Sequence, residues 1–376
     1  MTREIVIIGG GIIGCTTAYY LTRHPAYTRG AVKVTVIEAS AHGPAQGASG
    51  KAGGLVARWA YPKELVDVSF DEHVKLAEEH NGAERWGWRY VECGQWKGRG
   101  NLAPTDQGVG VDGSRAGKAR VKGKSLEKTK GLKGRRGETG LPDDLLWVEE
   151  EMTDLYAPMA RGDETAQVHP YLFTTSMMEL AQSRGAIYVH GKAVSIIEED
   201  KKVVGVDYID GGTNETIRIG ATDVVLAAGA WSRSLLPWLP ISGTRAHSVT
   251  IRPDRSSTPL APYVLFTEIA LKDGRNRKTV EPEIYARPDD EVYACGPGDN
   301  SPLPGSVDEV VVDQEACENI YRDVSSISKT LREGKVVGRQ ACFLPIVCVG
   351  DGGPIVGGVK GAEGLVVGTG HTCWVS

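Results

Sequence analysis

The chain has 376 residues, a length that indicates two or three domains and enough material for a hydrophobic core. Hydrophobic residues make up 41% and charged residues 24% of the sequence, a balance that excludes a mostly disordered chain, a coiled coil and a collagen-like fibre. The mean hydropathy is −0.23, and no run approaches the ~18 apolar residues of a membrane span. The seven cysteines are scattered and include no Cys-x-x-Cys pair, so we expect reduced thiols in the cytoplasm and neither a disulfide framework nor a metal site.

The net charge of −5 conceals one basic segment. Lys97–Gly137 holds twelve Lys and Arg against three Asp and Glu, together with ten glycines. Such a segment could contact nucleic acid or an acidic membrane. Because stacking aromatic side chains are absent from it, we favour a disordered basic insertion in a surface loop and expect no nucleic-acid partner.

The first forty residues predict one βαβ unit. Glu4–Ile8 has the composition of a short buried strand, and Gly9–Gly14 follows it as a glycine-rich turn. Cys15–Arg23 is typical of a helix, and Val32–Ile37 is a second apolar strand, closed by Glu38. Strand, turn, helix and strand in this order form the simplest parallel unit.

The later elements alternate between helical and extended patterns. In chain order we expect a helix over 61–80, a strand over 86–96, a helix over 172–183, a strand over 187–197 with a hairpin through 210–212, a strand over 223–228, short alternating strands over 245–325 and a last strand over 364–368. We therefore predict an α/β protein with two interleaved domains, one parallel and one mainly antiparallel.

The glycine turn carries the spacing Gly9-x-Gly11-x-x-Gly14 directly after a strand and at the start of a helix. The first glycine allows a tight turn, the second lets a pyrophosphate approach the backbone, and the third allows close packing of helix on strand. Glu38 lies where a carboxylate can accept hydrogen bonds from ribose hydroxyls. The pattern favours dinucleotide binding, with NAD or FAD preferred over NADP; the alternative is a glycine-rich turn beside an unrelated surface glutamate.

A second glycine-rich loop, Gly47–Gly54, follows the second strand. An NAD-binding domain needs no second glycine loop at this point, whereas a flavin extends beyond the pyrophosphate and needs backbone close to its polar edge. The residues alone leave two readings open: a contact loop for phosphate and flavin, or a flexible connection.

These segments together resemble the D-amino-acid oxidase, glycine oxidase and sarcosine oxidase superfamily of FAD-dependent oxidoreductases, and most of all its fungal branch. The resemblance spans nearly the whole chain except 97–137 and is carried by 5–14, Glu38, 47–54, 165–170, 223–231, 284–288, 351–358 and 368–374. It implies a Rossmann-like FAD-binding domain built from 1–60, 165–240 and 338–376. A mainly antiparallel α+β substrate domain, built from 61–164 and 241–337, would be interleaved with it.

The resemblance also implies which residues contact FAD. They are, from pyrophosphate to pyrimidine edge, Gly9, Gly11, Ile12, Ile13 and Gly14, then Glu38 at the adenosine ribose, Ser49, Lys51 and Gly54 along the pyrophosphate and flavin, Val194 at the adenine, Gly229 and Trp231 after the strand that faces the cofactor, and Gly370, His371 and Thr372.

The implied reaction is oxidation of a C–N bond in an amine or amino-acid-like substrate, with hydride transfer to flavin N5, oxygen as acceptor and hydrogen peroxide as product. The alternative from another class is a non-catalytic FAD-holding protein that acts in intracellular trafficking or protein interaction, with an endosome-associated or peroxisomal location in place of the cytoplasm. A third reading, an NAD-dependent dehydrogenase, is disfavoured by the second glycine loop.

Two departures from the family pattern concern the substrate end. Members that oxidise amino acids carry an Arg-Pro pair before the Asp-Gly-x-Pro segment, and this chain has none there. Arg339 and Arg287 are candidates for a substitute anion anchor, with a surface or structural ion pair as the alternative, and His371 is a further catalytic candidate. Cys342 lies near the position where some members tether the flavin through a thioether, so a covalent bond there is a possibility beside a structural role.

A third departure concerns the last residues. In the family, the segment Gly-x-Gly-His leads into a long helix whose positive end faces the flavin. The sequence has Gly368–His371 and five residues after it, so we expect that helix to be missing, together with any C-terminal targeting signal.

Overall fold

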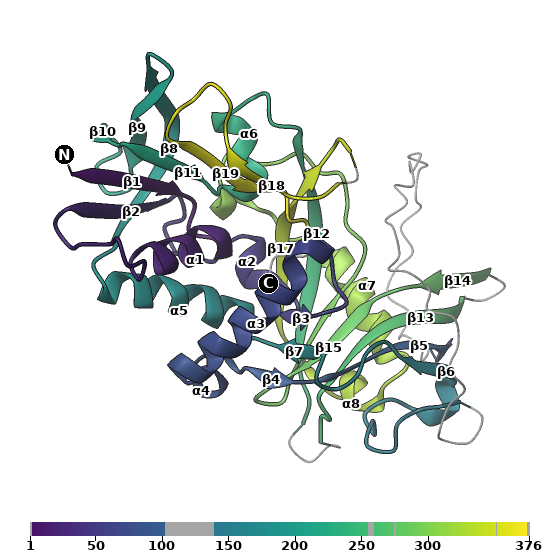
Figure 1. Cartoon of the computed structure of the whole chain (residues 1–376). Coiled ribbons are helices and arrows are strands. Elements are labelled where there is room, and N and C mark those ends of the chain that lie inside the picture. The colour runs from purple at the N-terminus through teal and green to yellow at the C-terminus, as the bar shows by residue number, and fades with distance from the viewer. Residues whose placement is uncertain (1, 102–138, 255–258, 274–275, 351, 374–376) are drawn as a thin grey trace.

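The computed structural model describes residues 2–101, 139–254, 259–273, 276–350 and 352–373. Two large β-sheets form two lobes, and a small three-stranded sheet lies where the lobes meet (Figure 1). The strands of each large sheet come from segments far apart in the sequence. The α/β class and the interleaving of a parallel with a mainly antiparallel sheet are confirmed.

The first sheet has the strand order β10-β9-β8-β2-β1-β11-β19-β18. Its strands are β1 (Arg3–Ile8), β2 (Val32–Glu38), β8 (Ile187–Glu199), β9 (Lys202–Asp210), β10 (Thr216–Gly220), β11 (Asp223–Leu226), β18 (Ile355–Gly358) and β19 (Leu365–Thr369). The central strands from β8 to β19 pair in parallel, whereas β9, β10 and β18 pair antiparallel at the two sides. The predicted strands at 4–8, 32–37, 187–197, 223–228 and 364–368 are all present.

Both faces of β1 are buried, which explains its uninterrupted apolar run. Ile5 and Ile7 face the helices α1 (Ile12–Leu21) and α5 (Pro170–Ser183). Val6 and Ile8 face the opposite layer, formed by β9 and the short helix α6 (Ser232–Leu235). The glycine turn and α1 are thereby held against the carboxyl end of β1 (Figure 1).

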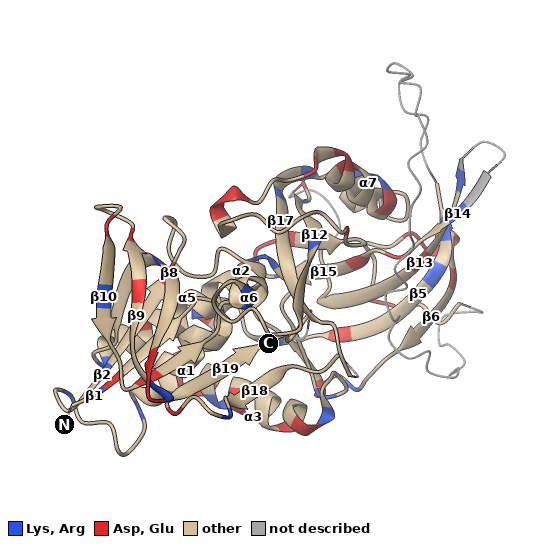
Figure 2. Cartoon of the chain, turned by 90° about the horizontal axis from the view of Figure 1, so that it is seen from above, with Lys and Arg blue, Asp and Glu red and all other residues tan. Residues whose placement is uncertain are grey.

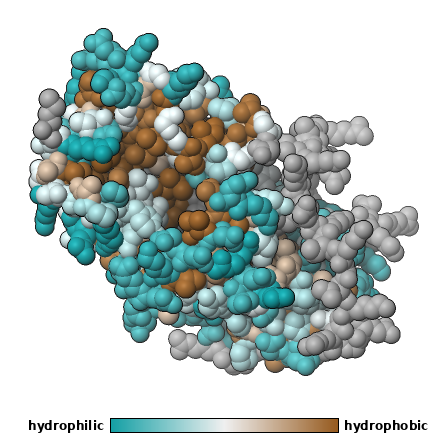
Figure 3. Space-filling model, viewed as in Figure 1, coloured by the Kyte–Doolittle hydropathy of each residue, from teal (hydrophilic) through white to brown (hydrophobic). Residues whose placement is uncertain are grey.

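Part of the α1 face of this sheet is open. A Cβ on Gly368 would lie 3.1 Å from Cγ2 of Ile13 in α1, so Gly368 and Val366 face α1. Val356 pairs with Gly368 and faces the same way; Val356 is 65% and Val366 38% exposed. Figure 3 shows an apolar strip over the region of β18 and β19.

The second sheet has the order β17-β12-β16-β15-β13-β5-β6, with β14 paired to β13. Its strands are β5 (Glu92–Gly100), β6 (Thr153–Pro158), β12 (Ile241–Arg252), β13 (Tyr263–Asp273), β14 (Asn276–Val280), β15 (Glu283–Arg287), β16 (Glu291–Cys295) and β17 (Lys335–Val347). Two helices, α7 (Gln314–Ser325) and α8 (Lys329–Arg332), pack on the main core of this lobe. Figure 2 shows charged residues on the outer surface of α7.

The remaining elements lie outside the two large sheets. They are α2 (Ala48–Lys51), α3 (Lys63–His80), α4 (Gly82–Trp86), the 3-10 turns η1 (Glu150–Met152), η2 (Gly229–Trp231) and η3 (Val307–Glu309), and the small sheet of β3 (Leu55–Ala57), β7 (Thr165–Gln167) and β4 (Arg89–Tyr90). None of the helices in the described ranges has the length and apolar character needed to cross a membrane. Among the described residues, no group of three or more His, Cys, Asp and Glu is placed to hold a metal ion.

Three expectations differ from the structure. The expected disordered insertion does not begin at Lys97, because Lys97–Gly100 belongs to β5 and pairs with β13. The rest of that prediction, residues 102–137, lies outside the described ranges. The expected strand over 86–96 begins late, since Trp86 ends α4. Residues 314–325 form α7 instead of a strand: Asp313 accepts hydrogen bonds from the amides of Glu315 and Ala316 and starts a helix there.

The strand β17 lies in the second sheet, where it pairs with β12 from Ile241 to Arg252. Its residues from 338 onward were expected in the FAD-binding domain. The exact division of the chain into domains stays a prediction.

Candidate functional site

The turn between β1 and α1 has a backbone that only glycine fits at two positions. Gly9 has φ +110°, and a Cβ there would lie 2.5 Å from the carbonyl oxygen of Ala227. A Cβ on Gly14 would lie 1.9 Å from the carbonyl oxygen of Gly9. These contacts hold α1 close to the sheet, as the spacing of the three glycines predicts.

The start of α1 is open to an anion. Gly11 is the N-cap and supplies no capping side chain; instead the Ser49 hydroxyl accepts a hydrogen bond from the amide of Ile12 at 3.0 Å. Ser49 comes from the second glycine loop, so this contact brings that loop to the helix N-terminus. Backbone amides and the helix dipole at this point favour a phosphate group.

Glu38 faces the same turn from the end of β2. Its carboxylate accepts hydrogen bonds from the amides of Gly10 at 2.6 Å and Ser40 at 2.8 Å. Burial raises the pKa of Glu38, and these amide donors act in the opposite direction. The carboxylate is therefore held beside the turn, within reach of a ribose.

A connecting segment of the second lobe lies over this corner. Residues 296–313 join β16 to α7, and within them Asp308 accepts hydrogen bonds from Ser40 Oγ and the amide of Ala41. The methyl Cγ2 of Val307 would lie 3.8 Å from a Cβ on Gly47. We call residues 299–313 the strap. Sequence reasoning missed Asp308, and its separation of 268 residues from Ser40 left no local signal for it.

The second glycine loop is packed as tightly as the first. A Cβ on Gly50 would lie 1.9 Å from the Ala45 carbonyl oxygen, and Gly54, with φ +88°, would approach the Val168 carbonyl oxygen at 2.0 Å. This loop is a fixed structure, which excludes the reading as a flexible connection.

Lys51 in this loop reaches the second lobe. Its ammonium Nζ donates to the carbonyl oxygen of Ala341 at 3.1 Å. Burial lowers the pKa of Lys51, while the neighbouring Cys342 acts in the opposite direction. Burial raises the pKa of the Cys342 thiol to about 11, with Lys51 opposing the shift. Lys51 and Cys342 are thus neighbours at the junction of the lobes.

Arg287 of β15 and Tyr293 of β16 donate hydrogen bonds to the backbone of this loop. The Arg287 guanidinium donates to the Ala52 carbonyl oxygen at 2.6 Å and pairs with Glu291 at 3.1 Å. The Tyr293 hydroxyl donates to the Lys51 carbonyl oxygen at 2.9 Å. Arg287 is 5% exposed, and burial lowers its pKa. Its charge is balanced by Glu291, so it supports the loop and is not a free anion anchor.

Arg339 lies elsewhere. Its guanidinium forms an ion pair with Glu318 of α7, and both side chains are partly exposed. The structure gives Arg339 no contact with the glycine loops.

The segment Gly370–Thr372, which follows the last strand β19 and was expected to contact FAD, lies at the junction of the lobes. Gly370 has φ +82°, and a Cβ there would lie 2.4 Å from Cγ2 of Val347. The amide of Thr372 donates to the carbonyl oxygen of Pro345, so this segment follows β17. Burial lowers the pKa of His371. Residues 370–372 therefore lie beside the strand that carries Cys342.

The strand β11 leads into a turn that touches β19. Gly229 has φ +52°, and its carbonyl oxygen accepts a hydrogen bond from the Thr369 hydroxyl at 3.0 Å. The indole of Trp231 donates to the carbonyl oxygen of Pro304 at 2.8 Å. Val194, by contrast, stands at a register shift of β8 and is 41% exposed.

A series of hydrogen bonds thus links most of the segments that carry the predicted contacts. Gly9–Gly14 and Glu38 lie at one end, the loop Gly47–Gly54 lies in the middle, and Gly370–Thr372 meets β17 at the other end. That series has the order of ribose, pyrophosphate and ring expected of an extended dinucleotide. The assignment of each single contact stays a prediction.

Comparisons with known proteins agree with this arrangement. The family model described as FAD dependent oxidoreductase (DAO) matches residues 4–374. TDA3 of Saccharomyces cerevisiae, named as an oxidoreductase, is 30% identical over 99% of this chain and 88% of its own length. The similarly named C1F5.03c of Schizosaccharomyces pombe is also 30% identical, over 99% of this chain and 90% of its own.

Solved structures share the fold. Glycine oxidase from Geobacillus kaustophilus superimposes with a TM-score of 0.68 at 16% identity, covering 99% of this chain and 90% of its own. Iminodiacetate oxidase from Chelativorans sp. BNC1 gives a TM-score of 0.66 at 17% identity, covering 98% and 90%. The glycine turn, the loop packed against it and the match over nearly the whole length lead to one conclusion: the chain belongs to the DAO family of FAD-dependent oxidoreductases.

Proposed function

We propose that the protein oxidises a C–N bond of an amine or amino-acid-like substrate, with oxygen as electron acceptor and hydrogen peroxide as product. The family membership supports an FAD-dependent oxidoreductase, and the fold is shared with glycine oxidase and iminodiacetate oxidase, whose named substrates are amines. The observation that carries the proposal is the braced loop Gly47–Gly54, which lies between the dinucleotide turn and the strands β15, β16 and β17.

The residues fit FAD. The glycines at 9 and 14 allow the turn to pack closely against the sheet, and the N-cap residue of α1, Gly11, has no side chain between the helix N-terminus and a pyrophosphate. A second fixed loop continues from Ser49 toward the second lobe, as a cofactor longer than a pyrophosphate requires.

FAD, when bound, would supply the two-electron acceptor for the hydride on the carbon next to the substrate nitrogen, with oxygen as the final acceptor. The substrate loses two electrons and two protons in total, its C–N single bond becomes an imine, and water converts the imine to a carbonyl and an amine. Oxygen takes up the two electrons and two protons and leaves as hydrogen peroxide.

The chain's own residues would orient the partners of this reaction. The Lys51 ammonium is held by its hydrogen bond to the Ala341 carbonyl oxygen. It would place a positive charge at the junction of the lobes, which favours the negative charge that a bound flavin gains on reduction. Arg287 and Tyr293 fix the carbonyls of Ala52 and Lys51, which sets the course of the loop.

The first experiment is an absorption spectrum of the purified protein, followed by anaerobic addition of single amines and amino acids. Flavin bands that bleach with an amine, and peroxide that appears when oxygen is admitted, are the expected results. Bands that bleach with none of them would overturn the amine substrate and favour an FAD-holding protein without this reaction. The cytoplasmic location stays a prediction, which imaging of a tagged chain would check.

A further inference from the structure

Glu283 lies at the point where three candidate contact elements meet. It is the first residue of β15, two positions before Tyr285 on the same face of the strand. The ring of Tyr285 lies against Gly53 of the second glycine loop, where a Cβ would be 2.5 Å from the ring. Glu283 also interacts electrostatically with Cys373, which directly follows the segment Gly370–Thr372.

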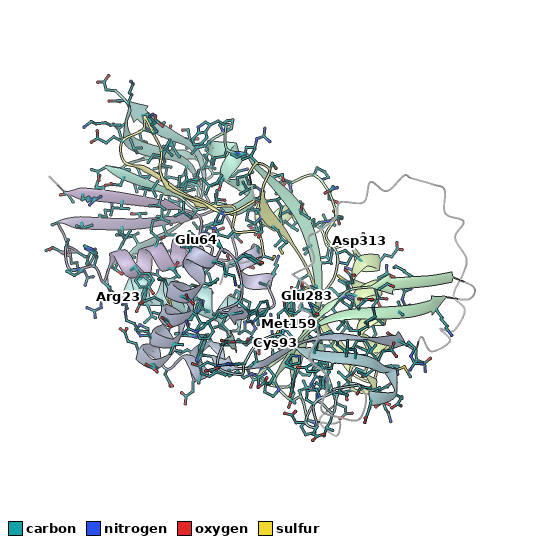
Figure 4. All side chains as sticks on the ribbon, turned by 45° about the vertical axis from the view of Figure 1, so that its right-hand side comes forward. Arg23, Glu64, Cys93, Met159, Glu283 and Asp313 are labelled. Carbon is teal, nitrogen blue, oxygen red and sulfur yellow. The ribbon has the colours of Figure 1, made fainter. Side chains whose placement is uncertain are left out.

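The carboxylate has neutral neighbours. Its Oε2 accepts hydrogen bonds from the Tyr285 hydroxyl and, at 3.7 Å, from the Cys295 thiol. Figure 4 shows Glu283 close to Met159 and Cys93 in the centre of the molecule, and the Cys93 thiol lies 4.0 Å from the Met159 sulfur. Desolvation raises the pKa of Glu283, and no cation contributes to the shift.

One carboxylate oxygen remains available. Both hydrogen bonds end on Oε2, and among the described residues no donor reaches Oε1. Glu283 is partly exposed as a residue, while its carboxylate is desolvated. A carboxylate surrounded by apolar and neutral groups is costly to keep ionised unless a cation or several donors compensate it.

Neither of the two candidate arginines offers the opposite recognition there. Arg287 is paired with Glu291 and turned to Ala52, and Arg339 is paired with Glu318 at the surface. The two positions from which a substrate carboxylate could have been clamped are therefore occupied. Glu283 is an acid near the loop whose hydrogen bonds with described residues come from neutral donors.

We infer that Glu283 binds the ammonium end of the substrate, and that the substrate class is amines that carry a positive charge and no carboxylate. The inference rests on the proposed function and narrows it. An ammonium donating to Oε1 would complete the carboxylate's hydrogen bonds and supply the missing cation in one contact.

The test uses the FAD-loaded protein and three compounds of equal chain length: 1,4-diaminobutane, 4-aminobutanoate and butylamine. Each is titrated anaerobically while the flavin spectrum is recorded, since a shift of the bands reports binding and bleaching reports reduction. We expect 1,4-diaminobutane to act at the lowest concentration and 4-aminobutanoate at the highest.

The variant Glu283→Gln keeps the shape and removes the charge. It should weaken binding of 1,4-diaminobutane roughly ten- to hundredfold, the effect of losing one charge-assisted hydrogen bond, and leave 4-aminobutanoate unchanged or improved. Glu281→Gln, an exposed acid two residues earlier, is the matched control and should behave as the unaltered protein. Bound FAD and the unfolding temperature of each variant show that the fold is retained.

The outcomes separate the inference from the proposed function. Tighter binding of 4-aminobutanoate than of 1,4-diaminobutane, an equal preference in Glu283→Gln, or no spectral change with any of the three would overturn the role of Glu283. Band shifts without bleaching, with the diamine preference lost in Glu283→Gln, would support Glu283 as a cation site while the oxidation itself fails. Bleaching by carboxylate-bearing amines in both the unaltered protein and Glu283→Gln would support the proposed oxidation and overturn the role of Glu283.

Discussion

Asp308 and Ser40, which are 268 residues apart in the chain, form a hydrogen bond that joins the two lobes. The Asp308 carboxylate accepts a hydrogen bond from Ser40 Oγ at 2.6 Å and a second from the amide of Ala41 at 2.9 Å. Ser40 in turn donates its amide to Glu38, the residue expected at the ribose. The strap is thus attached directly to the loop that carries the dinucleotide acid, and we expect cofactor release to depend on this attachment.

Removing this attachment should speed FAD release. We expect Asp308→Ala to raise the FAD dissociation rate roughly five- to tenfold, because charge-assisted hydrogen bonds are lost. Dissociation is followed by the recovery of flavin fluorescence after dilution. Ser40→Ala should have a smaller effect, and the double variant should be no worse than Asp308→Ala alone, since both remove one interaction. Glu215→Ala, an exposed acid in the β9–β10 connection, serves as control; additive effects would refute the coupling.

The first turn of α1 should tolerate no side chain at Gly14. A Cβ there would lie 1.9 Å from the Gly9 carbonyl oxygen, so Gly14→Ala must push α1 away from β1 and cost at least about 3 kcal/mol. We expect protein without bound FAD and with a lower unfolding temperature. Gly212→Ala places its Cβ 3.4 Å from the nearest atom and should retain both properties. Normal FAD content in Gly14→Ala would contradict the packing described.

These two predictions differ in how far the sequence could anticipate them. Gly14 was identified from local spacing, because a strand, a tight turn and a helix are contiguous in the chain. Asp308 and Glu283 were missed, since their roles depend on partners that folding brings from other segments. The helix α7 could have been found: Cys317, Ile320 and Val324 are buried at helical spacing behind an Asp313 cap. The pattern of the neighbouring strands was extended over it instead.

His73 should make the protein sensitive to mild acid. It is buried, packs between Trp88 and Phe173, and burial lowers its pKa to about 4. A histidine whose folded pKa lies below its unfolded value stabilises nothing above pH 6.5 and destabilises progressively as the pH falls from 6.5 to 4. The total cost is roughly 3 kcal/mol.

The measurement for His73 is urea unfolding at pH 7.5 and pH 4.5. The loss of unfolding free energy between these values should be smaller in His73→Phe than in the unaltered protein. His42→Gln changes an exposed histidine and should leave the loss as it was. Equal losses in all three proteins would show that His73 is not the cause.

Cys342 should not hold FAD covalently. Burial raises its pKa to about 11, and a thioether forms from the thiolate, which is scarce at neutral pH. After acid precipitation we expect the yellow colour in the supernatant, and Cys342→Ser should retain the same flavin content. A yellow pellet that turns colourless in Cys342→Ser would instead identify the tether.

Arg287 should contribute to stability and to cofactor binding in separable ways. Arg287→Met removes the nearer of two cations beside Glu291, with Arg252 remaining at 3.7 Å, and removes the donor to Ala52. We therefore expect a loss of about 2 kcal/mol in unfolding free energy. The double variant with Glu291→Gln should recover most of that loss. FAD affinity should stay low in both variants, because neither fixes the loop. Full recovery of affinity in the double variant would argue against the bracing role.

The order of strands in the first sheet has a consequence for synthesis. β1 pairs with β11, and β11 with β19, so three adjacent strands come from residues 3–8, 223–226 and 365–369. A ribosome therefore makes the dinucleotide turn first and the last neighbour of its sheet more than three hundred residues later. Until then the outer edge of β11 is unpaired and its apolar side chains lack their final neighbours. We therefore expect stable capture of the cofactor to follow the synthesis of β19.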